Sequence, residues 1–169
     1  MTLVEILIAL AIASLMTLTG WRAIDALQTS RDRVQADATQ WQQFDDFFVT
    51  LEADLRRASL SEFSGSESGM SLLQPAVDAG PALTTVRYRV AGVESANTGI
   101  PGGRTRVWRE ATGAVTDRTP MADALTVSFA YSADGIRFDA TSGEYPRAVR
   151  VVLTVPGTGA TVERLLALR

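Results

Sequence analysis

The chain opens with a long apolar run that contains one charged side chain, Glu5. The run covers residues 1–20. A helix of about 20 residues, rising about 1.5 Å per residue, spans roughly the 30 Å hydrocarbon core of a bilayer. The run therefore predicts a transmembrane helix with an acid in its first turns. A buried carboxylate costs on the order of 2.5–3.5 kcal/mol at the bilayer centre and less near an end. We therefore expect a cation to meet Glu5, either the chain's own amino terminus or a group of another chain.

Three other interpretations of the run remain open. A cleaved secretory signal peptide would account for its small-x-small triplets, but the run carries an acid and no basic segment precedes it. A plain membrane anchor would need no Glu5. A core helix of a soluble protein would need more surrounding protein than the remaining residues supply, because the run is apolar on every face.

The helix is predicted to continue beyond the membrane. Trp21 and Arg22 follow the apolar run, and such residues favour the membrane interface. Residues 22–59 contain no Gly or Pro and are rich in good helix formers. Farther along, apolar residues recur at alternating spacings of three and four, which indicates one buried helix face. We expect this stripe to pack on a sheet, and its members are Trp41, Phe44, Phe48, Leu51, Leu55 and Ala58.

The rest of the chain has the pattern of short β-strands, and residues 61–69 and 91–103 are expected to be loops. Asp134-Gly135 predicts a hairpin turn into a strand at 136–138. About seven mostly antiparallel strands are expected, which gives an α+β fold with a long N-terminal helix on an antiparallel sheet. The predicted parts are 1–20, 21–59 and 60–169. The predicted strands are 70–73, 83–90, 105–110, 124–131, 136–138, 148–155 and 161–168.

Composition argues against several functions. The chain has no His and no Cys, so the usual zinc ligands, thiol nucleophiles and imidazole bases are missing. The net charge of −3 argues against nucleic acid as a partner. We therefore predict no catalytic residue, no cofactor and no metal.

Three groups of acidic or glycine residues partly match known catalytic or metal-binding motifs. The segment 65–69 resembles a nucleophile elbow in its glycines, but its central residue is a glutamate. The adjacent acids Asp45 and Asp46 point to different helix faces and are interpreted as solvated. The acids Asp134, Asp139 and Glu144 could offer oxygens to Ca²⁺ but fit no twelve-residue calcium loop, and we interpret them as a solvated hairpin.

The motif at residues 2–12, with Glu5 fifth in the chain, resembles the mature N-terminus of the type IV pilin and type II secretion pseudopilin superfamily. The resemblance implies that a prepilin peptidase removes a leader and methylates the amine of Met1, where the family usually has phenylalanine. It also implies that Glu5 binds a neighbouring subunit's N-terminal amine during filament assembly. The helix end at 51–58, a strand at 104–110 and the segment 145–153 further resemble the minor pseudopilin J.

This second resemblance implies a subunit of the pseudopilus tip that supports export of folded proteins across the outer membrane. The implied partners are the I and K minor pseudopilins, with the H type as a further candidate, and the major pseudopilin. The implied location is the bacterial inner membrane, crossed once, with the C-terminal domain in the periplasm. A minor type IV pilin and a membrane-tethered enzyme or binding module are the alternatives.

Overall fold

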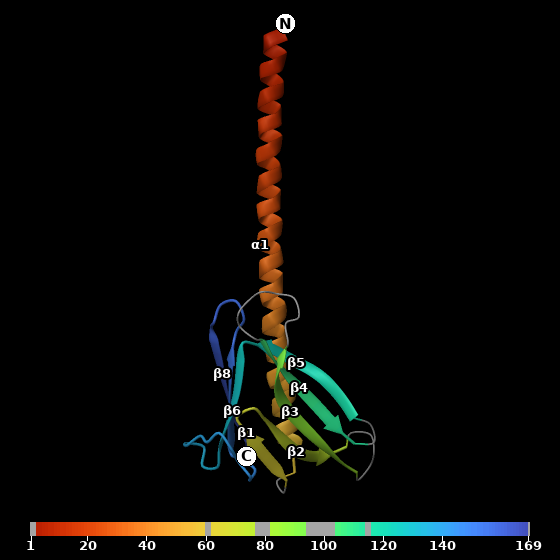
Figure 1. Cartoon of the computed structure of the whole chain (residues 1–169), viewed down its shortest axis with the longest axis vertical. Helices are drawn as coiled ribbons and strands as arrows, with labels where there is room; N and C mark the ends of the chain where they lie inside the picture. The colour runs from red at the N-terminus through yellow and green to blue at the C-terminus, as the bar shows by residue number, and fades with distance from the viewer. Residues whose placement is uncertain (1–2, 60–61, 77–81, 94–103, 114–115, 169) are drawn as a thin grey trace. The chain divides into compact units, whose positions relative to one another are not determined.

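The computed structural model describes residues 3–59, 62–76, 82–93, 104–113 and 116–168. One helix, α1 (Leu3–Arg57), precedes all of the strands (Figure 1). Its length agrees with a sequence that has no proline before residue 75 and, within the helix, a glycine only at position 20. The chain divides into two compact units, Met1–Gln42 and Gln43–Arg169, so α1 contributes to both.

The last turn of α1 carries groups that stabilise a helix end. Arg56 and Arg57 place positive charge near the C-terminal carbonyls, which favours the helix dipole. The backbone N–H of Ser59 then donates to the carbonyl of Leu73 at 2.6 Å, and the Tyr145 hydroxyl donates to the carbonyl of Leu55. The helix end is thus hydrogen-bonded to the strand region that follows it.

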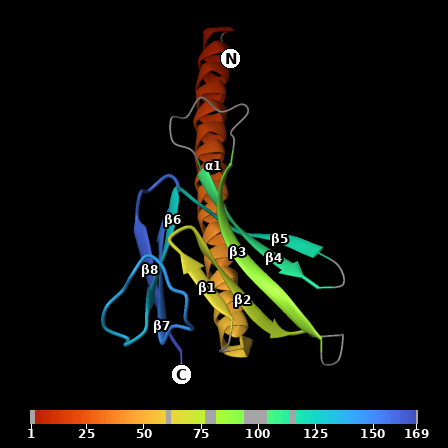
Figure 2. The ribbon, with the colours of Figure 1, turned by 60° about the horizontal axis from the view of Figure 1, so that its bottom comes forward.

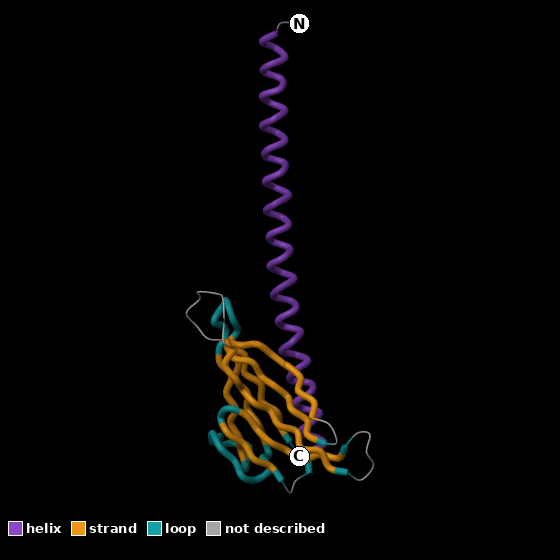
Figure 3. The backbone as a smooth tube through the Cα atoms, turned by 45° about the vertical axis from the view of Figure 1, so that its right-hand side comes forward, coloured by secondary structure: helices purple, strands orange, loops and turns teal. Residues whose placement is uncertain are grey.

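The strands form two antiparallel sheets, and within each sheet the strands pair in the order of the sequence (Figures 2 and 3). The first sheet has the order β1-β2-β3-β4-β5 and the second has the order β6-β7-β8. The α+β class and the long N-terminal helix packed on antiparallel sheets are confirmed, and the fold matches a pilin-like description. The strands are β1 (Phe63–Ser66), β2 (Gly69–Pro75), β3 (Leu83–Val93), β4 (Arg104–Thr112), β5 (Thr116–Ala124), β6 (Thr126–Ser132), β7 (Ala148–Thr154) and β8 (Thr161–Ala167).

The β1–β2 hairpin joins the two sheets. The backbones of Gly65 and Ser142 exchange hydrogen bonds of 2.7 and 3.1 Å. The Tyr131 hydroxyl, from β6, donates to the carbonyl of Gly69 at 2.7 Å and also contacts the carbonyl of Ser66 at 3.0 Å. A Cβ at position 65 would lie 2.5 Å from the Tyr131 ring, so only glycine fits there.

Two sequence expectations about strands were wrong, and one strand was missed. Residues 63–66 form β1 rather than part of a loop, and β5 was not predicted at all. The expected strand at 136–138 does not form. Instead, the Asp134 carboxylate accepts hydrogen bonds from the backbone N–H groups of Ile136 and Arg137, which holds this segment as a turn.

Candidate functional site

Glu5 lies in the first turns of α1 among apolar side chains that face outward. No side chain of α1 between Leu3 and Thr39 is buried. Among the described residues, none forms a salt bridge with Glu5. This helix has an apolar stretch long enough to cross a membrane by length and composition. The prediction for Met1 lies outside the described residues.

The two residues predicted at the membrane interface lie on α1 directly after the apolar run. Trp21 exposes 73% of its surface, and Arg22 is also exposed. An exposed indole followed by a guanidinium is the combination that membrane–water interfaces favour. The interface role of both residues stays a prediction.

The predicted packing stripe begins one turn later than expected. Phe44 starts the buried face of α1, whereas Trp41, one turn earlier, keeps 51% of its surface exposed. Phe47, which sequence reasoning missed, is fully buried and lies with its ring centre 5.1 Å from that of Phe48. Two consecutive apolar residues at 47 and 48 indicate that the buried face of the helix is wider than the spacing of three and four residues predicts. The core members on α1 are Phe44, Phe47, Phe48, Leu51 and Leu55.

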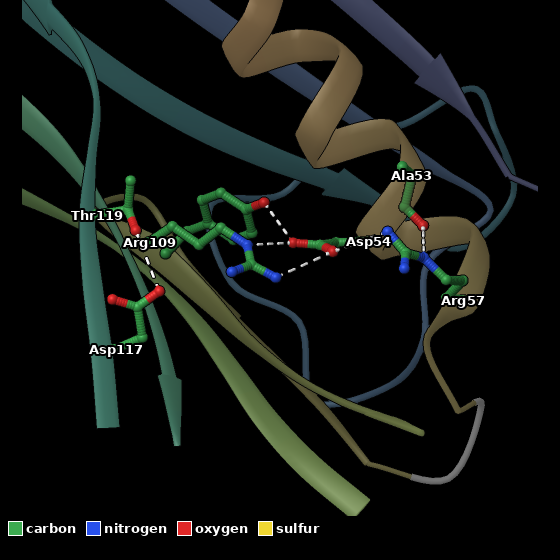
Figure 4. Close-up of polar contacts among 7 residues, drawn as sticks. Ala53, Asp54, Arg57, Arg109, Asp117 and Thr119 are labelled. Atoms are coloured by element: carbon green, nitrogen blue, oxygen red, sulfur yellow. Dashed lines mark hydrogen bonds and ion pairs between the residues drawn. The ribbon is translucent and has the colours of Figure 1, made fainter. Parts of the chain in front are cut away.

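Among the described residues of α1, Asp54 is the one charged residue that is buried, and its side chain accepts hydrogen bonds from two strands (Figure 4). Its carboxylate accepts from Arg109 Nε at 2.7 Å and from Arg109 Nη2 at 3.3 Å, a bidentate contact. The hydroxyl of Tyr88, on β3, donates to the same carboxylate at 2.7 Å. Arg57 adds a longer ion pair at 3.7 Å. These contacts connect the last turns of α1 to β3 and β4.

The electrostatics of this cluster keep the Arg109 guanidinium charged and the Tyr88 hydroxyl protonated. The hydrogen bond to Asp54 raises the pKa of the Arg109 guanidinium, which keeps that group charged. Burial, reinforced by the negative charge of Asp54, raises the pKa of the Tyr88 hydroxyl, which keeps that group as a donor. The contacts of Asp54 with Tyr88 and Arg109 define the cluster as a structural link between the helix end and the sheet. Sequence reasoning missed it, although an acid at position 54, inside the apolar stripe, was a usable signal.

The candidate calcium acids do not converge. Among the residues that the structure describes, no three His, Cys, Asp or Glu side chains come close enough to hold a metal ion. The carboxylate of Asp134 is used by Ser132 and by two backbone N–H groups, and these hydrogen bonds lower its pKa. Asp139 pairs through its backbone with Tyr131. The predicted absence of metals and cofactors stays a prediction.

The tyrosines make alkaline stability a test of the packing. Burial raises the pKa of Tyr88 and Tyr131, so the folded chain keeps protons that unfolded tyrosines release near pH 10. The folded state then binds more protons than the unfolded state, and its stability falls as pH rises above about 10. Each tyrosine contributes up to about 1.4 kcal/mol per pH unit there. The chain has no lysine, cysteine or histidine to obscure this effect.

The expected loss is measured by denaturant unfolding of the full chain in detergent micelles at pH 9, 10.5 and 11.5. Tyr131→Phe removes one titrating group and should flatten the decline, although it lowers stability at pH 9 because the hydroxyl bonds to Gly69 and Ser66 are lost. An unchanged slope in that variant would show that Tyr131 does not hold its proton in the folded chain.

Comparison with known proteins leaves the family open: no protein-family model matches the chain, and no curated protein matches it in a sequence search. Residues and geometry therefore carry the functional argument.

Proposed function

We propose that this chain is a membrane-anchored filament subunit without enzymatic activity, of the minor pseudopilin J type, at the tip of a type II secretion pseudopilus. The observation that carries the proposal is Glu5, a lone acid near the start of an outward-facing apolar helix. A helix of 55 residues followed by antiparallel sheets supports the same class of protein. The subclass rests on the sequence resemblance alone.

In the proposed mechanism, Glu5 accepts a charge-assisted hydrogen bond from the N-terminal ammonium of an adjacent subunit. Opposite charges attract more strongly in a lipid-like dielectric than in water. The pairing also removes the cost of an isolated carboxylate in hydrocarbon, so subunits would leave the bilayer as pairs rather than singly. The ammonium on this chain would be that of Met1, methylated by a prepilin peptidase.

The proposed setting is the bacterial inner membrane, crossed once by the apolar part of α1, with the sheet domain in the periplasm. The proposed partners are the I and K minor pseudopilins, the H type as a further candidate, and the major pseudopilin. Assembly with them would support export of folded proteins across the outer membrane. Nucleic acid is not among the proposed partners, because the chain has a net charge of −3.

Glu5→Val is the direct test of this mechanism. We expect the variant to remain in the membrane fraction, because the substitution makes the apolar run more hydrophobic. Co-purification with the other filament subunits should fall at least about tenfold, since a hydrogen bond to a charged group is worth about 1.5–3 kcal/mol. The measurement is quantitative mass spectrometry of subunits captured from membranes at native expression, with secretion assayed in parallel.

The matched control removes a different acid from the same helix. Glu5→Gln and Asp25→Asn are both isosteric neutralisations on exposed turns of α1. Glu5→Gln should reproduce the assembly defect, and Asp25→Asn should assemble as the unaltered chain does. Normal capture and secretion with Glu5→Val would contradict the assembly role. That result would support the alternative in which the apolar helix only anchors a binding module in the membrane.

Glu5 and the helix-plus-sheet architecture also fit a minor type IV pilin. The two filament systems differ in the genes that accompany them. Secretin and exoprotein-secretion genes beside this one would support the pseudopilin, and pilus-retraction genes would support the pilin. The partners captured from membranes distinguish the same two classes.

A further inference from the structure

The outer face of the first sheet carries a row of arginines that differ in how they are neutralised. Arg106 forms a bidentate pair with Asp123 at 2.6 and 2.8 Å. Arg118 contacts Glu110 at 3.3 Å. Among the described residues, no carboxylate pairs with Arg87 or Arg89, and both side chains are exposed on β3. Glu110 lies opposite Arg87 in the strand register but pairs with Arg118, so neither Arg87 nor Arg89 has its own carboxylate partner among the described residues.

Serine hydroxyls line a shallow hollow beside these two arginines. The hollow is formed by β1, β2 and β3, and its lining includes Ser64, Ser66, Ser68, Ser71, Arg87 and Arg89. No acidic side chain among the described residues contributes to this lining, although Glu67 stands at the tip of the same hairpin. In the strand register, Ser71 lies opposite Arg87, so hydroxyl donors and guanidinium donors are side by side on one face.

The arginine spacing indicates the form of the anion. Side chains two residues apart on a strand lie on one face, roughly 6.7 Å from each other. Alternate side chains of an extended peptide have the same spacing, so each arginine can meet one carboxylate of such a peptide. A guanidinium and a carboxylate form two parallel hydrogen bonds when they meet in plane.

We propose that Arg87, Arg89 and the adjoining serines bind an extended, acidic segment of a partner protein, with carboxylates at alternate positions. The charge complementarity is local, because the whole chain is acidic with a net charge of −3 while this face presents unpaired cations. The site lies wholly within the Gln43–Arg169 unit and does not depend on Glu5 or on filament assembly.

The test uses the full chain in detergent micelles and a short peptide of alternating serine and glutamate, carrying a neutral dye. Fluorescence anisotropy should show saturable binding that weakens as salt is raised, because exposed charges are screened. Arg87→Gln/Arg89→Gln should weaken binding about tenfold. The matched control Arg137→Gln/Arg147→Gln removes two exposed arginines elsewhere in the same unit and should bind as the unaltered chain does.

Two further probes decide what is recognised. A peptide of alternating serine and glutamine should not bind, and a peptide with its glutamates in one block should bind more weakly than the alternating one. Equal affinity for the blocked peptide, competition by inorganic phosphate at the peptide's own concentration, or equal binding by the Arg87→Gln/Arg89→Gln variant would overturn the proposal. All of these readouts are independent of secretion, so failure of the filament role would leave them unaffected.

Discussion

Asp54→Ala is expected to destabilise the sheet domain by about 3–5 kcal/mol. The substitution leaves the Arg109 guanidinium and the Tyr88 hydroxyl facing a buried site that no longer holds their acceptor. Removing one partner of a buried ion pair costs this much because the remaining charge is desolvated and uncompensated. The free energy of unfolding of a domain is only about 5–15 kcal/mol, so the variant should lose a large part of it. Urea unfolding of the full chain in micelles, followed by near-ultraviolet circular dichroism, measures the change.

A control variant and a double variant test whether the buried ion pair causes this loss. Asp45→Ala makes the same change on the same helix, but Asp45 is 69% exposed and its contact to Arg164 is 3.8 Å long. Its effect should stay below about 1 kcal/mol. Asp54→Leu combined with Arg109→Met removes both charges and should recover the part of the loss that comes from the unpaired guanidinium, although the Tyr88 hydroxyl still lacks its acceptor. A double variant no more stable than Asp54→Ala would contradict the view that the unpaired cation causes the defect.

Gly69→Ala is expected to cost about 3–5 kcal/mol, for two reasons that act together. The φ angle of Gly69 is +154°, which side-chain-bearing residues rarely adopt. A Cβ there would also collide with the backbone oxygen of Tyr88, which cannot move without disturbing the β2–β3 pairing. The backbone strain from the positive φ and the steric overlap with Tyr88 each cost about 1–3 kcal/mol. The midpoint of urea unfolding measures the combined loss.

Gly143→Ala is the control for this substitution. A Cβ at Gly143 would meet no heavy atom of the described residues within 4 Å, and the φ angle of Gly143 is not positive. Alanine should therefore be tolerated there with little change in stability. Similar urea midpoints for Gly69→Ala and Gly143→Ala would show that the chain near β2 and β3 adjusts more easily than the close approach indicates.

Local chemistry explains what the sequence predicted well. The apolar run, the absence of helix breakers and the buried stripe from Phe44 to Leu55 are properties of consecutive residues, so helix α1 and its packing face followed from spacing. Glu5 stood out for the same reason, because a lone acid in an apolar run needs no knowledge of the fold. Trp41 shows the limit of this reasoning, since spacing gives the face of a helix but not the turn at which burial begins.

The missed features depend on residues that are distant in sequence or unusual in composition. Asp54 acquires its role from Tyr88 and Arg109, which are 34 and 55 residues away. β1 is rich in serine and glycine, and β5 contains Pro120, so neither has the composition of a typical strand. Both are the edge strands of the first sheet, and β5 tolerates a proline because one of its sides pairs with no other strand of that sheet.

The sheet order has a consequence for how the domain is synthesised. Because the strands pair in chain order within each sheet, a hairpin is complete as soon as its second strand leaves the ribosome. Such near-neighbour pairing lowers the entropy lost in loop closure and speeds folding relative to interleaved topologies. The closing of β6 onto the β1–β2 hairpin and the packing of α1 onto β3 and β4 both join residues that are distant in sequence, so these contacts should become protected from hydrogen exchange later than the hairpins.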